Sequence, residues 1–129
     1  MSCSALEITN LLYRYAELID SGQLEQAASL FQHATLKMGH AEDPQSAAAV
    51  LAVWRRGVKL YSCGTPRTKH VITNPIVEVE EATHRATCRS YYTVLQATED
   101  FPLQVIAARC STTGMSPCAS PLRPPRWGW

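Results

Sequence analysis

Two side chains of this sequence have types suited to proton transfer, Asp20 and His70. Histidine is the side chain that titrates near neutrality without help from its surroundings. Asp20 comes at the end of a predicted helix, and His70 comes at the start of a long predicted strand that should face the helices. If the two meet, the carboxylate would orient the imidazole and stabilise its protonated form, so that His70 acts as a general base. Their spacing along the chain does not by itself establish that contact.

Each of these residues also has a purely structural interpretation. A lone histidine on an inward-facing strand is more often a hydrogen-bonded core residue than a catalyst, and Asp20 suits a turn in which it bonds its own backbone. A carboxylate at a helix C-terminus faces the negative end of the helix dipole, which makes Asp20 a poor choice for stability alone. The other histidines, His33, His40 and His84, fall at a helix end, in a loop and in a turn. We expect these three to be exposed and structural.

Helical patterns fill the first half of the chain. Apolar residues recur over Ile8–Ile19 at the spacing of one helix face, and Ser21–Gly22 ends this helix. A shorter helix is predicted from about Leu24 to Phe31. Asp43–Pro44 combines an N-cap residue with proline at the first helical position, and predicts a third helix that runs to about Leu60.

Strand patterns fill the second half. The β-branched stretch Lys69–Glu80 and the stretch Arg85–Gln96 predict two long strands joined by a hairpin turn at Glu81–His84. A third strand begins at Leu103–Ala108. Pro75 cannot donate to a strand ladder, so a bulge or a sheet edge is expected there. Helices followed by a meander of strands predict an α+β fold with the helices packed on one face of an antiparallel sheet.

The last 21 residues differ from the rest. Residues 109–129 hold four of the eight prolines and two of the three tryptophans, and they contain no acidic residue. They show neither the strand period nor the helix period, so their composition favours a coil. The sequence therefore predicts a domain over residues 1–108 and an atypical Pro-rich tail over residues 109–129.

Composition excludes several classes of function. The chain has 129 residues, enough for one domain, with 12 Lys+Arg against 11 Asp+Glu and a net charge of +1. Nucleic acid is not expected as a partner, because binding phosphates needs a surplus of basic residues. No apolar run is long enough to cross a membrane, and no signal peptide is visible. Five scattered cysteines without a C-x-x-C pair predict reduced thiols, a cytoplasmic location and no metal site.

Four stretches together resemble a known family. They are Glu7–Ala16 (EITNLLYRYA), Leu18–Asp20 with Leu30–Phe31 downstream, Thr65–Ile76 (TPRTKHVITNPI) and Ala86–Tyr92 (ATCRSYY). Their order resembles the SnoaL-like branch of the NTF2-like superfamily over about residues 4–108. The resemblance implies a cone-shaped fold in which a curved antiparallel sheet wraps around helices and encloses an apolar pocket.

The resemblance also implies a function. Relatives with this layout include scytalone dehydratase, lindane dehydrochlorinase and polyketide cyclases, and the first two use an Asp and a His at the positions of Asp20 and His70. The implied protein is a lyase, isomerase or cyclase that needs no cofactor and no metal, acts on an apolar or aromatic small molecule and forms a homodimer. Its catalytic residues would be Asp20 and His70, and its pocket candidates are Arg14, Tyr15, Trp54 and Tyr92.

The C-terminal end departs from the family pattern. Such domains normally finish with two more long strands, whereas the strand that begins at Leu103 runs into the Pro-rich tail. We therefore expect the closing strands to be missing or replaced, through a frameshift or truncation near Arg109 or through a tail that covers the sheet edge or exchanges with a second subunit. The alternative functions are a non-catalytic ligand-binding or dimerisation module and an inactive variant.

Overall fold

The computed structural model describes residues 3–34, 36 and 45–115 of the 129-residue chain. Three helices come first and three strands follow, as the sequence predicts. The elements are α1 (Cys3–Asp20), α2 (Leu24–Ser29), α3 (Ala47–Gly57), β1 (Thr68–Glu80), the short 3₁₀ turn η1 (Glu81–Thr83), β2 (Arg85–Gln96) and β3 (Gln104–Met115).

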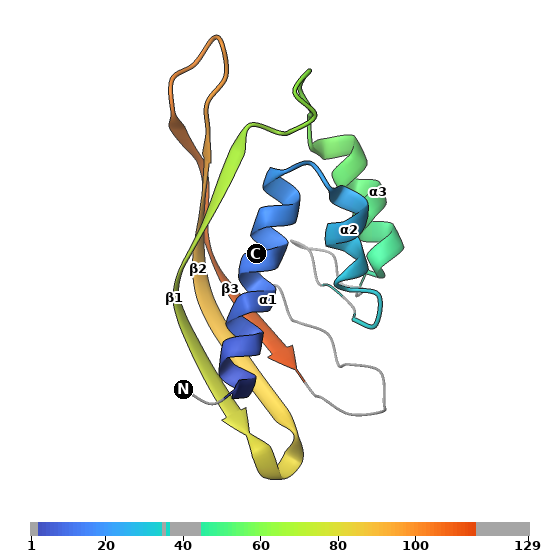
Figure 1. The fold of residues 1–129 in the computed structure, drawn as a ribbon, viewed down its shortest axis with the longest axis vertical. Coiled ribbons are helices and arrows are strands. Elements are labelled where there is room, and N and C mark those ends of the chain that lie inside the picture. Colours follow the sequence, from blue (N-terminus) through green and yellow to red (C-terminus); the bar gives the residue numbers. More distant parts are fainter. Residues whose placement is uncertain (1–2, 35, 37–44, 116–129) are drawn as a thin grey trace.

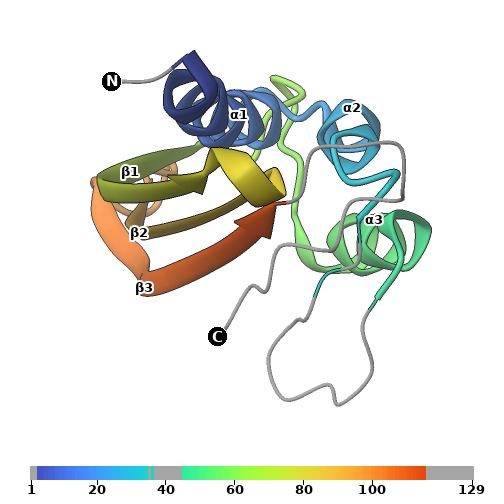
Figure 2. The same cartoon turned by 90° about the horizontal axis from the view of Figure 1, so that it is seen from below.

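The strands form one antiparallel sheet in the order β1-β2-β3. In Figure 1 the long, curved sheet stands on one side and all three helices stand on the other. The view from below shows α1 lying over β1, while α2 and α3 lie beside the sheet (Figure 2). The predicted α+β class is confirmed. None of the helices in the described ranges has the length and apolar character that a membrane crossing requires.

Helix α1 packs against two different partners along its length. Its N-terminal half places Ile8 and Leu12 against Ala86 and Cys88 of β2. Its C-terminal half joins the helical cluster, in which the buried residues are Leu18, Ile19, Leu24 and Ala27 and the partly buried ones include Leu51 and Trp54. Because these two contact regions share one helix, Tyr15 lies at the junction between the sheet side and the helical side of the molecule.

The β1–β2 hairpin follows the sequence prediction closely. The turn Glu81–His84 is present, and His84 closes it in the left-handed conformation with a φ of 50°. The register of β1 against β2 shifts between Thr73 and Ile76. Pro75 lies inside this irregularity, beside Asn74 with a φ of 53°. The expected bulge at Pro75 is confirmed, and it allows a proline without an N–H to lie within a long strand.

Two expected boundaries are wrong. Helix α3 begins at Ala47, and Ser46 caps it by accepting a hydrogen bond from the Ala49 N–H at 3.2 Å, so the helix starts later than Asp43–Pro44 predicts. Asp43 and Pro44 lie outside the described residues. Strand β3 continues to Met115 instead of giving way to coil after Ala108.

The reason for the longer β3 is visible in its pairing. Residues 109–115 extend the ladder against β2 as far as the pair Ala86↔Met115. The first proline after Pro102 is Pro117, so residues 109–115 contain no proline and their N–H groups can donate to the strand ladder. The average composition of residues 109–129 does not show this difference. The Pro-rich remainder, residues 116–129, lies outside the described residues.

The turn after α1 depends on Gly22. This residue has a φ of +78°, and its N–H donates to the Ile19 carbonyl at 3.0 Å. A Cβ atom at this position would lie 2.1 Å from the carbonyl oxygen of Gly64. Glycine therefore serves both the left-handed conformation and the close approach of the loop that precedes β1.

We expect Gly22→Ala to destabilise the protein by about 1 to 2 kcal/mol from the backbone conformation alone, and by more through the clash with Gly64. Gly57→Ala is the matched control, because a Cβ there meets nothing within 4 Å and alanine is the better helix former. Urea unfolding of both variants measures the difference. Equal stabilities for the two variants would contradict the role given to Gly22.

Candidate active site

The carboxylate of Asp20 accepts three hydrogen bonds from the first residues of β1. Its Oδ1 lies 2.7 Å from His70 Nδ1 and accepts from the Thr68 hydroxyl at 2.8 Å. Its Oδ2 accepts from the backbone N–H of His70 at 2.7 Å. The end of α1 is thereby tied to the start of β1, and the structure brings together the two residues that the sequence singles out for proton transfer.

The environment of Asp20 favours the charged carboxylate. The side chains of Asp20 and His70 are 10% and 14% exposed. Burial by itself would raise the pKa of Asp20, but the hydrogen bonds from the His70 ring, the His70 N–H and the Thr68 hydroxyl outweigh it and lower the pKa. Asp20 is therefore ionised at neutral pH, where it can hold a protonated imidazole.

The same hydrogen bond selects the tautomer of His70. An ionised carboxylate can only accept hydrogen bonds, so Nδ1 of His70 must carry the hydrogen. In the neutral ring the lone pair then lies on Nε2, the nitrogen that does not contact Asp20. A histidine oriented in this way has the arrangement of a general base.

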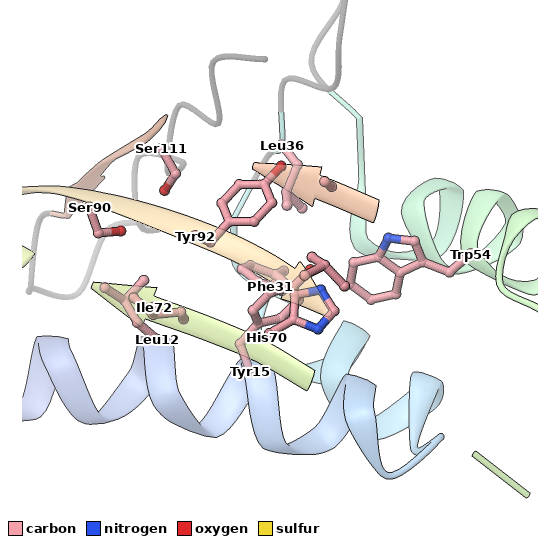
Figure 3. A pocket seen from close by; sticks show the side chains of 12 residues that line it. Leu12, Tyr15, Phe31, Leu36, Trp54, His70, Ile72, Ser90, Tyr92 and Ser111 are labelled. Carbon is pink, nitrogen blue, oxygen red and sulfur yellow. The ribbon is translucent and has the colours of Figure 1, made fainter. Parts of the chain in front are cut away.

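His70 lines an apolar cavity of about 150 Å³ between the sheet and the helices. Figure 3 shows side chains from α1, α3 and all three strands converging on this space. A cavity of similar size binds benzene in a protein engineered to contain one. The lining residues are Leu12, Tyr15, Phe31, Leu36, Trp54, His70, Ile72, Ser90, Tyr92, Val94, Ala107 and Ser111.

Aromatic rings surround the imidazole. The ring of Tyr15 meets His70 edge to face at a centroid distance of 6.2 Å, and the ring of Tyr92 lies at 6.5 Å. Tyr15 also contacts Phe31 at 5.7 Å and Trp54 at 6.0 Å. Burial, followed by the nearby Tyr92 and Asp20, raises the pKa of Tyr15 well above its usual range. Its hydroxyl therefore stays protonated and able to donate a hydrogen bond.

Three of the four predicted pocket residues line the cavity, namely Tyr15, Trp54 and Tyr92. The fourth, Arg14, does not line it. Arg14 lies on the exposed side of α1 in an ion pair with Glu17 and is not among the lining residues. Neighbouring positions on a helix point about 100° apart, so the inward direction of Tyr15 turns Arg14 away.

Sequence reasoning missed three polar residues of the site. Thr68 precedes His70 by two positions on β1, so the strand period places both on one face. The same period relates Ser90 to Tyr92 on β2. Ser111 lies opposite Ser90 in the β2–β3 register, inside the stretch expected to be coil. The alternation would have found Thr68 and Ser90, whereas Ser111 needed the pairing of β3.

No cluster of three or more His, Cys, Asp or Glu side chains that could hold a metal ion occurs within residues 3–34, 36 and 45–115. The described side chains of the site are one carboxylate–imidazole pair, aromatic rings, hydroxyl groups and aliphatic residues. Such a set of side chains can orient a small apolar molecule and move a proton.

A family model described as a SnoaL-like domain matches residues 2–113 of the chain. The matched region runs from the start of α1 almost to the end of β3. It therefore includes the Asp20–His70 pair and every residue that lines the cavity. A search of curated proteins gave no match.

Solved structures share the fold at low sequence identity. An NTF2-like protein with a cystatin-like fold from Novosphingobium aromaticivorans has a TM-score of 0.71 and 20% identity, covering 95% of this chain and 77% of that chain. A candidate scytalone dehydratase from the same organism has a TM-score of 0.68 and 14% identity, over 94% and 78%. ActVI-ORFA from Streptomyces coelicolor has a TM-score of 0.74 and 13% identity, over 98% and 96%.

The hydrogen bonds of Asp20 predict a specific pH dependence of stability. A carboxyl group whose pKa is lower in the folded protein contributes stability above its unfolded pKa, near 4, and this contribution is lost as the pH falls through the folded value. We expect Asp20→Asn to cost about 2 kcal/mol at pH 7 and clearly less at pH 3. Urea unfolding at both pH values measures the two differences.

Glu25→Gln is the matched control for this experiment. Glu25 pairs with Arg55 across an exposed surface, where ion pairs contribute little, so its replacement should change stability slightly at either pH. A cost of Asp20→Asn that is equal at pH 7 and pH 3 would contradict the account of the carboxylate.

Proposed function

The chain belongs to the SnoaL-like domain family, and we propose that it is a lyase, isomerase or cyclase that moves a proton on a small apolar molecule by means of Asp20 and His70. The observation that carries this proposal is the hydrogen bond between the Asp20 carboxylate and Nδ1 of His70 on the wall of an apolar cavity. Burying a carboxylate costs free energy. Its placement against a histidine of the cavity wall suits a reaction in which that histidine takes up a proton and becomes positively charged.

The proposed step is general base catalysis. Nε2 of His70 removes a proton from a carbon next to a carbonyl group of the ligand, and the electron pair of the broken C–H bond moves toward the carbonyl oxygen. Asp20 stabilises the imidazolium that forms. The proton then returns to a departing hydroxyl group, which leaves as water, or to another carbon of the same ligand, so the proposed steps use groups of this chain alone.

Tyr15 suits the role of the hydrogen-bond donor to the oxygen on which negative charge develops. It lines the cavity beside His70, and its raised pKa keeps the phenol protonated. A neutral donor in a dry cavity stabilises such an oxygen more than it would in water. Tyr92 and Trp54 supply flat apolar walls, which favour a cyclic or aromatic ligand.

The relatives agree with this class of chemistry. One structurally similar protein is described as a candidate scytalone dehydratase, and dehydration is an elimination that removes a proton and a hydroxyl group. The family and the apolar cavity favour a small cyclic ketone or hydroxyketone as the ligand.

We expect His70→Gln to lower the rate of proton exchange at least about a hundredfold, because a positioned general base contributes on that scale. The assay follows deuterium incorporation next to the carbonyl of cyclic and aryl ketones in D₂O by NMR. His33→Gln is the matched control, since His33 is exposed and does not line the cavity. The midpoints of thermal unfolding establish that both variants are folded.

Two results would contradict the proposal. One is proton exchange that survives His70→Gln in a folded protein. The other is binding of the ketones to the unaltered chain without any exchange, which would favour the alternative of a non-catalytic ligand-binding module. Binding raises the midpoint of thermal unfolding, so the second result is recognised in the same samples.

A homodimer is the second part of the proposal. The sheet face that points away from the helices carries exposed apolar side chains, among them Val71 on β1, Tyr91 on β2 and Val105 on β3. Tyr91 alone is 54% exposed. A second copy that covers this face would remove apolar surface from water and shield the sheet from further association.

We expect the double variant Val71→Lys/Tyr91→Lys to sediment as a monomer at concentrations at which the unaltered chain is a dimer, because lysine on both surfaces introduces charge repulsion into the interface. Val53→Lys is the control, since Val53 is exposed on α3 and away from the sheet. Sedimentation velocity measures the three proteins. An unaltered chain that is monomeric, or a double variant that stays dimeric, would contradict this interface.

A further inference from the structure

The hydroxyl group of Ser111 is buried in the cavity wall without a hydrogen-bond partner in the described part of the chain. The residue is only 2% exposed. Burying a hydroxyl group without a partner costs free energy, so such a group calls for an explanation. In Ser111 the hydroxyl borders a space large enough for a ligand.

A second hydroxyl lies beside it. Ser90 on β2 pairs with Ser111 on β3 in the antiparallel register, and it also lines the cavity. Side chains directly opposite each other in such a pair project from the same face, with Cβ atoms roughly 5 Å apart. Ser90 is 5% exposed. The two serines thus place two hydroxyl groups together on the cavity wall.

This pair of serines lies away from His70 along the sheet. His70 is the register partner of Val94, four positions from Ser90 on β2, which corresponds to about 13 Å along the strand. Figure 3 shows Ser90 and Ser111 toward one end of the group of lining side chains and Trp54 at the other, with the ring of Tyr92 between them. The two serine hydroxyls and the His70 ring therefore lie at different places along the cavity wall.

We propose that Ser90 and Ser111 form an anchor for a second oxygen atom of the ligand, so that the site selects ring compounds with oxygen substituents at opposite ends. The proposal rests on the proposed function, because the first oxygen is the one beside His70 and Tyr15. A serine hydroxyl both donates and accepts, so the anchor takes a neutral hydroxyl or carbonyl group. Ser111 in particular gains the partner that it lacks within the described residues.

The experiment compares three ligands that differ only in their oxygen atoms. The ligand 4-hydroxyacetophenone carries oxygen at both ends of one ring, whereas acetophenone and 4-ethylphenol each carry one. NMR titrations of the full chain at pH 6.5 give their affinities. We expect the two-oxygen ligand to bind about fivefold more tightly than the better of the other two, which is the size expected of one net hydrogen bond.

The variants assign that advantage to the serines. In Ser111→Ala and in Ser90→Ala/Ser111→Ala, 4-hydroxyacetophenone should bind no more tightly than the better of the two one-oxygen ligands. Acetophenone and 4-ethylphenol should still bind to both variants. Thr87→Val is the matched control, because the Thr87 hydroxyl lies on the opposite, exposed face of β2 and bonds Glu78 at 3.1 Å. This variant should keep the full advantage.

The stability of the unliganded variant provides an independent readout. Removing a buried hydroxyl that lacks a partner should leave the thermal midpoint of Ser111→Ala unchanged or raise it. A midpoint lowered by several degrees would show that the hydroxyl serves the fold, and would overturn the proposal. The proposal is also overturned if 4-hydroxyacetophenone keeps its tighter binding in the double variant. It is overturned as well if 4-hydroxyacetophenone binds the unaltered chain no more tightly than the one-oxygen ligands.

Different results would contradict the oxygen anchor and the acid–base function. Affinities are measured without turnover, so a protein that shows the serine-dependent advantage but no proton exchange contradicts the acid–base function and leaves the oxygen anchor intact. Proton exchange that depends on His70, together with affinities that ignore both serines, contradicts the oxygen anchor and supports the acid–base function.

Discussion

The structure depends on one carboxylate that accepts three hydrogen bonds. Asp20 ends α1 where the helix dipole disfavours a negative charge, and it compensates through the Thr68 hydroxyl and through the N–H and the ring of His70. The same contacts fix the position of α1 over β1. The cavity lies between the sheet and the helices, and the Asp20–His70 pair joins the end of α1 to the start of β1 at its wall.

Much of this arrangement follows from local sequence rules. The apolar period of α1, the turn glycine Gly22 and the alternation of β1 and β2 each act over a few residues, and each predicts its element correctly. The bulge at Pro75 follows from the missing N–H of proline. The family resemblance then identified Asp20 and His70 as one pair, which periodicity alone left undecided because no local rule joins residues so far apart.

The remaining features depend on tertiary contacts. Whether β3 extends past Ala108 is decided by its pairing with β2, and the composition of the tail contains no information on that register. Ser111 becomes a cavity residue only through this pairing with Ser90. Arg14 is one helix position from Tyr15, which faces the cavity, and that difference is enough to turn the side chain of Arg14 to the surface.

The Asp20–His70 pair is tested most directly by the protonation state of the His70 ring, obtained from long-range ¹H–¹⁵N NMR spectra at pH 8. We expect the hydrogen to lie on Nδ1, bonded to Asp20, and Nε2 to carry the lone pair, with an Nε2 resonance that shifts when a cyclic ketone is added. A hydrogen on Nε2 would contradict this expectation, because His70 would then have no base to offer the cavity and Asp20 would have lost its ring donor.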